Sequence, residues 1–257
     1  MIKFFRRIRQ KLLSENRFSK YLLYAIGEII LVVIGILIAL QINNWNENRK
    51  VHSNQLKYLD LLKNEALTNL ASLDTHLDVI KELAEGQKEV FRLIDTPKDS
   101  LSETYVSKTF FDAFSTLISF NYKNSVLTEI KNSGELKNIE NDSIRIALIA
   151  LEPFIEQVKF QENNVNTHQN NILEQINHNG DLRMIMENVG YHNLLGIGKA
   201  NGISKGNKRV LNNDYFKNEL LLYSLITNDL IDNLYPRIRN QFVHIINKIE
   251  KEIGGKK

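Results

Sequence analysis

An acidic side chain inside a long apolar run is the residue whose position most suggests chemistry. Glu28 lies seven positions into residues 21–40, where every other residue is apolar, small or a tyrosine. If this run crosses a bilayer, an ionisable group there costs a few kcal/mol unless it has a partner. Two interpretations stay open. Glu28 meets a polar group of a multi-pass protein and relays protons, or it is protonated, snorkels or hydrogen-bonds its twin in a homodimer.

A loop rich in glycine and cations, residues 189–209, is the second candidate site. It holds five of the twelve glycines, and backbone amides beside cations can cradle an anion. We expect an anion or glycan contact here, or else a mobile connector between two long helices. The motif GIGKANG matches no phosphate-binding pattern and follows no predicted strand, which excludes a nucleotide site. The cations available for the contact are Lys199, Lys205, Lys208 and Arg209.

Motifs of the common catalytic and metal sites are missing from the sequence. The absence of cysteine excludes disulfide scaffolds, thiolate zinc sites and cysteine nucleophiles. The six histidines form no HExxH motif and no i, i+4 pair, and no GxSxG motif is present. We therefore expect no enzyme, no metal and no cofactor, although a site of scattered residues on facing helices would leave no such pattern.

Residues 21–45, which carry Glu28, are predicted to form a transmembrane signal anchor. Twenty residues at ~1.5 Å each match a hydrocarbon core of about 30 Å. The run continues into bulky polar residues instead of a small-residue cleavage site, which predicts that it is retained. Tyr21 and Tyr24 at one edge and Trp45 at the other lie where aromatic rings prefer the headgroup region.

The distribution of cations predicts the orientation of this anchor. Residues 1–20 hold seven lysines and arginines against one glutamate, whereas Arg49, Lys50 and Lys57 are the cations that follow the span closely. By the positive-inside rule the N-terminus stays in the cytoplasm. Residues 46–257 then lie beyond the bacterial inner membrane, in the periplasm. Because the basic excess is confined to one tail, no nucleic-acid-binding face is expected.

Residues 1–20 form a basic tail that we expect to lie along the inner leaflet as an amphipathic helix. Phe5, Ile8 and Leu12 would share one stripe, and anionic lipid attracts the cations around them. The alternative is an unstructured tail that serves to set the topology. The cations expected at the lipid are Lys3, Arg6, Arg7, Arg9 and Lys11.

Small residues in the span predict where another helix would approach it. Gly35 and Ala39 form a small-xxx-small pair, and Gly27 lies on a similar face about two turns earlier. Such spacing lets two membrane helices pack closely. Besides the lipid bilayer, we therefore expect a homo-oligomer or a membrane-protein partner.

The residues after the span predict an all-α fold, an antiparallel bundle of about four long, coiled-coil-like helices. Twelve glycines and three prolines in 257 residues leave few turns for a β fold. Apolar residues recur at three- and four-residue intervals, as in helices packed along one face. The helices are expected over residues 56–94, 110–118, 125–133, 144–176 and 213–249.

Several details of these helices remain to be decided. A break is expected at residues 43–48 if the span does not continue into the bundle. In the 144–176 repeat, eight of the ten inward positions are apolar, the exceptions being Glu162 and Gln169. Pro153 predicts a kink within one helix, because the phase of the repeat survives it. Around Pro236 two consecutive four-residue steps predict a phase slip.

The stretch KYLLYAIGEIILVVIGILIALQINNWNE, within residues 1–47, carries a resemblance to a known family. It resembles the N-terminal anchor of uncharacterised single-pass membrane proteins of flavobacteria and their relatives. Ser133 to Leu136, with the helix that follows from Asp142, adds a looser likeness. The resemblance implies a membrane location and topology and no reaction.

Three functional hypotheses follow from these predictions. The first is a non-enzymatic, membrane-anchored bundle that presents an interaction surface in the periplasm as a scaffold. The second is an accessory or stator-like subunit that docks on a multi-pass partner through Glu28. The third is an extracytoplasmic ligand-sensing bundle that signals through a partner, since 20 cytoplasmic residues leave no room for an output domain.

Overall fold

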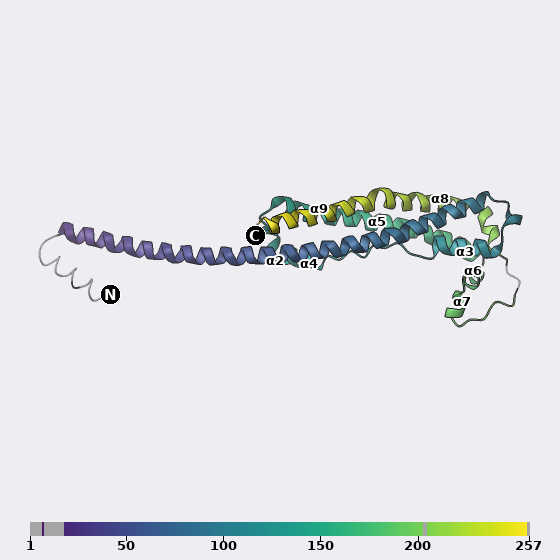
Figure 1. Cartoon of the computed structure of the whole chain (residues 1–257), viewed down its shortest axis with the longest axis horizontal. Helices are drawn as coiled ribbons and strands as arrows, with labels where there is room; N and C mark the ends of the chain where they lie inside the picture. The colour runs from purple at the N-terminus through teal and green to yellow at the C-terminus, as the bar shows by residue number, and fades with distance from the viewer. Residues whose placement is uncertain (1–6, 8–17, 203–204, 256–257) are drawn as a thin grey trace. The chain divides into compact units, whose positions relative to one another are not determined.

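The computed structural model describes residues 7, 18–202 and 205–255, and all regular structure within those ranges is helical (Figure 1). The all-α prediction is therefore confirmed. The longer helices are α2 (Phe18–Asp95), α3 (Glu103–Phe114), α4 (Ser125–Ser133), α5 (Asp142–Asn179), α8 (Asp214–Asp229) and α9 (Tyr235–Gly254). The short ones are η1 (Lys98–Ser100), η2 (Glu135–Asn138), α6 (Leu182–Asn188), α7 (Tyr191–Leu194), η3 (Lys208–Asn212) and η4 (Leu230–Leu234).

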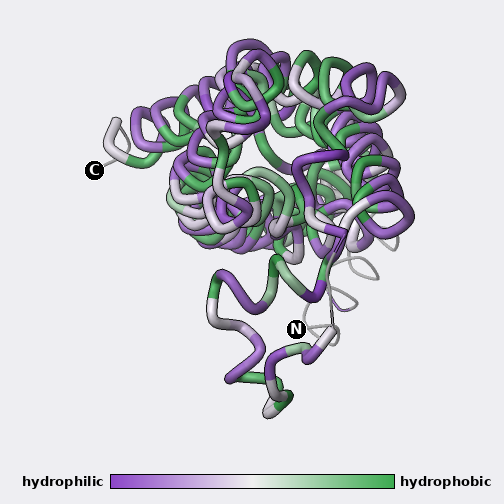
Figure 2. Tube along the Cα trace, turned by 90° about the vertical axis from the view of Figure 1, so that its right-hand side faces the viewer, coloured by the Kyte–Doolittle hydropathy of each residue, from purple (hydrophilic) through white to green (hydrophobic). Residues whose placement is uncertain are grey.

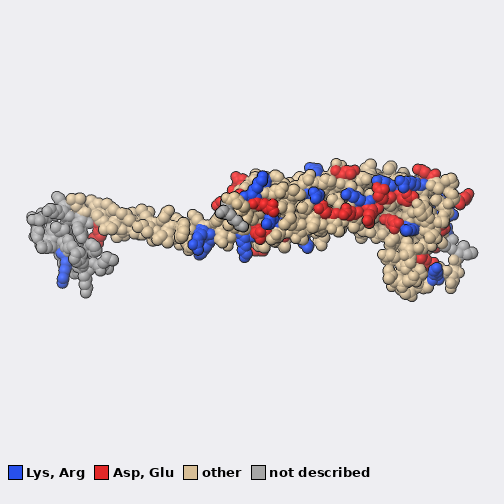
Figure 3. Space-filling model, viewed as in Figure 1, with Lys and Arg blue, Asp and Glu red and all other residues tan. Residues whose placement is uncertain are grey.

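The chain divides into two compact units, Met1–Lys57 and Tyr58–Lys257. In the first unit, α2 carries the apolar run, and its described side chains are exposed or partly exposed, for example Leu31 at 68% and Ile38 at 55%. Figure 3 shows this stretch almost free of charged side chains. The helix also covers residues 43–48, so the break considered there is absent.

In the second unit, four helical columns run alternately up and down (Figure 1). They are the C-terminal part of α2, then α3 with α4, then α5, and finally α8 with α9. The α2 column ends at Asp95, two residues before Pro97, as predicted. The ammonium group of Lys98 donates to the carbonyls of Leu93 and Ile94 at 2.9 and 2.7 Å, which satisfies orphan acceptors of the last turn.

Helix α5 follows its predicted register closely. Asn141 caps its N-terminus by accepting a hydrogen bond from the amide of Ser143. All ten inward positions predicted between Ile144 and Ile176 are buried, including Glu162 and Gln169. Pro153 lies inside this one helix. A continuous buried face therefore runs the length of α5, and it carries two polar side chains into the core.

The last column absorbs the predicted phase slip with a π-helical turn. Asn213 caps α8 by accepting from the amide of Phe216, close to the predicted start. The π-helix η4 then adds a residue to one turn, and α9 begins at Tyr235. Leu230, Leu234 and Tyr235 are all buried. The slip therefore lets Tyr235 face the core beside the two leucines.

One helix prediction is wrong. The stretch over residues 110–118 was expected to be helical throughout, but α3 ends at Phe114. Residues 115–124, which we call the strap, contain no helix and connect α3 to α4. Leu117 is 61% exposed and Ile118 is 1% exposed, an alternation that a helical pattern did not predict. The strap thus continues the second column, between α3 and α4, where its helix is interrupted.

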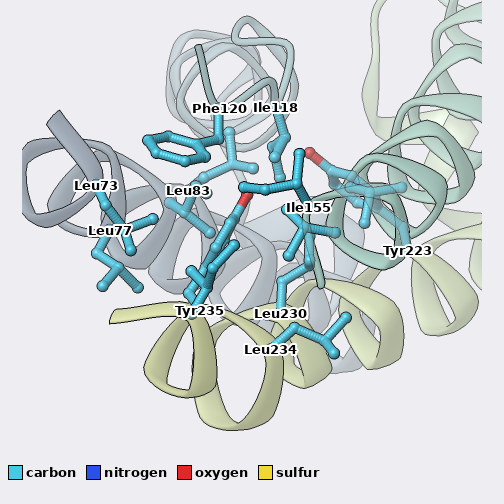
Figure 4. Packing of buried hydrophobic residues seen from close by; sticks show 14 of the residues in the cluster. Leu73, Leu77, Leu83, Ile118, Phe120, Ile155, Tyr223, Leu230, Leu234 and Tyr235 are labelled. Carbon is cyan, nitrogen blue, oxygen red and sulfur yellow. The ribbon is translucent and has the colours of Figure 1, made fainter. Parts of the chain in front are cut away.

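The core of the second unit takes residues from every column and from the strap. Ile118 and Phe120 of the strap lie in the same buried cluster as Leu83 of α2 and Tyr235 of α9 (Figure 4). Further along, the rings of Phe114 and Phe216 pack edge to face. The segment with α6 and α7 lies outside the ring of longer helices (Figure 2).

Candidate functional site

The predicted site residues of the span lie on the N-terminal part of α2. Glu28 is partly exposed there. A Cβ atom added at Gly27 or Gly35 would meet nothing within 4 Å, and Ala39 is exposed. These positions have room for an approaching helix. Their role in packing against such a helix stays a prediction.

Trp45 is 65% exposed, and the guanidinium carbon of Arg49 lies 5.8 Å from the centre of its ring. This cation–π pair places a positive charge beside the aromatic ring expected at the membrane interface. Of the other predicted lipid contacts, Arg7 is exposed. The remaining ones lie outside the described residues: Lys3, Arg6, Arg9, Lys11 and the side chains of Tyr21 and Tyr24.

The C-terminal end of the loop expected to bind an anion is bound by a carboxylate of the protein itself. Glu103 of α3 accepts hydrogen bonds from the amides of Asn207 and Lys208, at 2.7 and 3.4 Å. Gly206 makes room for that carboxylate, since a Cβ atom there would lie 2.3 Å from its Oε1. The Lys208 ammonium donates to the carbonyl of Leu101. Lys199, Lys205 and Arg209 are exposed, and their contact with an external anion or glycan stays a prediction.

The strap is held to its neighbours by amide side chains that imitate a strand partner. Asn166 of α5 accepts from the amide of Ile118 at 2.9 Å and donates to the carbonyl of the same residue at 2.8 Å. Asn69 of α2 makes the same pair of bonds with Lys123, at 2.9 and 2.7 Å. Each asparagine satisfies both backbone groups of one residue, which removes the cost of leaving them unpaired near the core.

The two polar residues on the buried face of α5 complete this clamp. Glu162 accepts from the amide of Phe120 at 2.9 Å. Gln169 donates to the carbonyls of Phe114 and Thr116, at 2.8 and 2.9 Å. Glu162 and Gln169, the two polar residues of the apolar repeat, thus bind backbone groups at the end of α3 and in the strap. A polar residue in an apolar register was the signal in the sequence, but its target could not be identified there.

A buried polar chain extends from Glu162 across the bundle. The Tyr235 hydroxyl donates to Glu162 Oε1 at 2.7 Å, so its oxygen accepts from Nε2 of His76, 3.1 Å away. Burial raises the pKa of Glu162, against the hydrogen bonds from Tyr235 and Phe120, which lower it. Burial lowers the pKa of His76. The chain links α2, α5, α9 and the strap.

A small hollow lies between the strap and α2. Its volume is about 80 Å³, and it is lined by His76, Val79, Ile80, Leu83, Thr116, Leu117, Ile118 and Ser119. A second hollow, of about 10 Å³, lies near Tyr122. Within the described part of the chain, no group of three or more histidines and acids is placed to hold a metal ion. The arrangement can accept a small apolar group beside backbone hydrogen-bonding groups.

These features define a class of protein: an all-helical chain with an N-terminal helix long and apolar enough to cross a membrane, followed by an antiparallel bundle. The chain belongs to a family of unknown function, DUF6090, which matches residues 28–197. The resemblance is therefore confirmed as far as an uncharacterised family. Neither curated proteins nor solved structures give a match.

Proposed function

We propose that this chain is a single-pass protein of a bacterial inner membrane that presents its bundle in the periplasm as an interaction scaffold. The observation that carries the proposal is the apolar part of α2. Its described side chains are exposed or partly exposed, and within the described residues it is the one helix long and apolar enough to cross a membrane. Exposed apolar side chains over this length are stable in lipid and costly in water.

The orientation rests on the cations at the two ends of the span. Seven lysines and arginines precede it within residues 1–20, which favours a cytoplasmic N-terminus. Figure 3 shows acidic and basic side chains mixed over the bundle, as on a surface that faces water. The bundle would then meet its partners outside the cytoplasm.

The scaffold role rests on the buried faces of the long helices. The long buried faces of α2 and α5 support a rigid bundle whose outer surface is available for contacts. A homo-oligomer through Gly35 and Ala39 is part of this proposal.

Cysteine accessibility tests the proposed topology directly, because the natural chain contains no cysteine. Ser14→Cys places a thiol in the basic tail, and Asn218→Cys places one on the exposed side of α8. A membrane-impermeant maleimide should label Asn218→Cys in intact spheroplasts and Ser14→Cys only after lysis. The reversed pattern, or labelling of both before lysis, would overturn the proposal, and the unsubstituted chain is the control.

The alternative of a stator-like subunit is tested in the same membranes. The protein is isolated in mild detergent and its partners are identified by mass spectrometry, with wild type beside Glu28→Gln. A stoichiometric multi-pass partner that is lost in the variant would replace the scaffold proposal by docking through Glu28. Recovery of the chain with itself in both samples would exclude that docking.

A further inference from the structure

The strap has one edge bound and one edge free. In an extended chain, the N–H and C=O groups of alternate residues point to opposite sides. Backbone groups of Thr116, Ile118 and Phe120 are bound by side chains of α5. The backbone groups of Leu117 and Ser119 make no hydrogen bond within the described part of the chain. These two residues thus present two donors and two acceptors, spaced as on the edge of a β-strand.

The free edge borders the hollow on the side of α2. Leu117 and Ser119 line this hollow together with Val79, Ile80 and Leu83. Its volume of about 80 Å³ is two to three times the ~30 Å³ share of one water molecule, enough for a small aliphatic side chain. Val79 is 41% exposed and Leu117 is 61% exposed. An apolar group placed here would cover both.

The strap is also rigid enough to serve as a template. Asn166 fixes both backbone groups of Ile118, and Asn69 fixes both of Lys123. The side chains of Ile118 and Phe120 are buried in the core. A segment that is already ordered loses little conformational freedom when a partner binds, which favours affinity.

We propose that the free edge of the strap binds an extended peptide segment of a partner protein by strand addition, with an aliphatic side chain of that segment in the hollow. A peptide backbone supplies donors and acceptors at the matching spacing, whereas an acyl chain supplies none. The hollow is lined by no lysine, arginine or acid, so the side chain that enters it is uncharged. The inference rests on the proposed function as an interaction scaffold and names the class of its partner.

The test uses the full chain in nanodiscs and a labelled pool of capped pentapeptides, Thr-X-Thr-X-Thr, where X is Ala, Val, Leu or Ile. Binding is read by fluorescence polarisation, and amide hydrogen exchange locates it. We expect the pool to bind and to slow exchange in residues 115–124. A matched pool with N-methylated backbone amides should not bind, because its donors are removed.

A pair of variants at one position separates backbone recognition from the side chain. Ser119→Pro removes a free-edge donor that has no partner in the described chain, and Ser119→Ala keeps it. Loss of that bond and the added ring should weaken binding about tenfold in Ser119→Pro, while Ser119→Ala binds like wild type. Both should unfold at the wild-type temperature, because a non-helical residue before position 119 tolerates proline.

The proposal fails if the unmethylated pool does not bind, if the methylated pool binds equally well, or if the two Ser119 variants bind alike. It also fails if, without peptide, hydrogen exchange in residues 115–124 slows as the concentration of the chain rises, because a second copy would then occupy the edge. The labelling of Asn218→Cys is measured separately. Peptide binding with reversed labelling would leave the site in place and overturn the topology.

Discussion

Asn166→Ala tests whether the strap is held by side chains of α5. The substitution removes both bonds to Ile118, a residue 1% exposed. An unsatisfied buried polar group costs about 1–3 kcal/mol. Because water has partial access to the strap, we expect the two backbone groups left without a partner to cost about 2–3 kcal/mol together. For a domain of this size, each kcal/mol shifts the melting temperature by about 2–4 °C. We expect a fall of about 5–10 °C.

The matched control is Asn163→Ala, which makes the same change one turn earlier, at an exposed position of the same helix. Alanine favours helix over asparagine by less than about 0.7 kcal/mol, so the control should be neutral or slightly more stable. Thermal unfolding of the full chain in detergent is followed by far-UV circular dichroism, and hydrogen exchange is measured over residues 115–124. Equal melting temperatures for the two variants, with unchanged exchange in the strap, would refute the reasoning.

Three further substitutions probe the buried charge and the close contacts. Glu162→Gln keeps an acceptor for both donors. Because burial raises the folded-state pKa of Glu162, wild type loses stability as the pH rises through that pKa. The variant should therefore melt a few degrees higher at neutral pH and converge with wild type near pH ~4; a difference independent of pH would contradict this. Gly86→Ala normally gains up to about 1 kcal/mol in a helix, but here a Cβ atom would lie 3.0 Å from the backbone of Ala113. Denaturant unfolding should show a net loss, and a gain would argue against so close an approach of α2 and α3. Gly206→Ala adds a side chain at φ +70° and 2.3 Å from the Glu103 carboxylate. It should cost about 1–3 kcal/mol and speed exchange of the amides that Glu103 binds; unchanged exchange would show that the carboxylate does not hold this loop.

The sequence predicted the parts of the fold that depend on local periodicity. The ten inward positions of α5 and the end of α4 at Ser133, directly before Gly134, are confirmed. Gly134 has a φ of +74°, which glycine adopts without strain. The helix predicted through Ile118 was wrong, because Phe110, Phe114 and Ile118 recur at helical spacing although the last of them belongs to the strap.

What the sequence determined by itself is the presence of an apolar helix long enough for a bilayer and the registers of the long helices. Both follow from the tendency of apolar side chains to leave water. The spacing of those side chains is set by residues near one another in the chain. Only the tertiary structure decided where Glu162 and Gln169 direct their polar groups. Their partners, Phe120 and Thr116, lie more than 40 residues away. The free edge of the strap exists because those distant side chains satisfy its other edge, and no local pattern records that pairing.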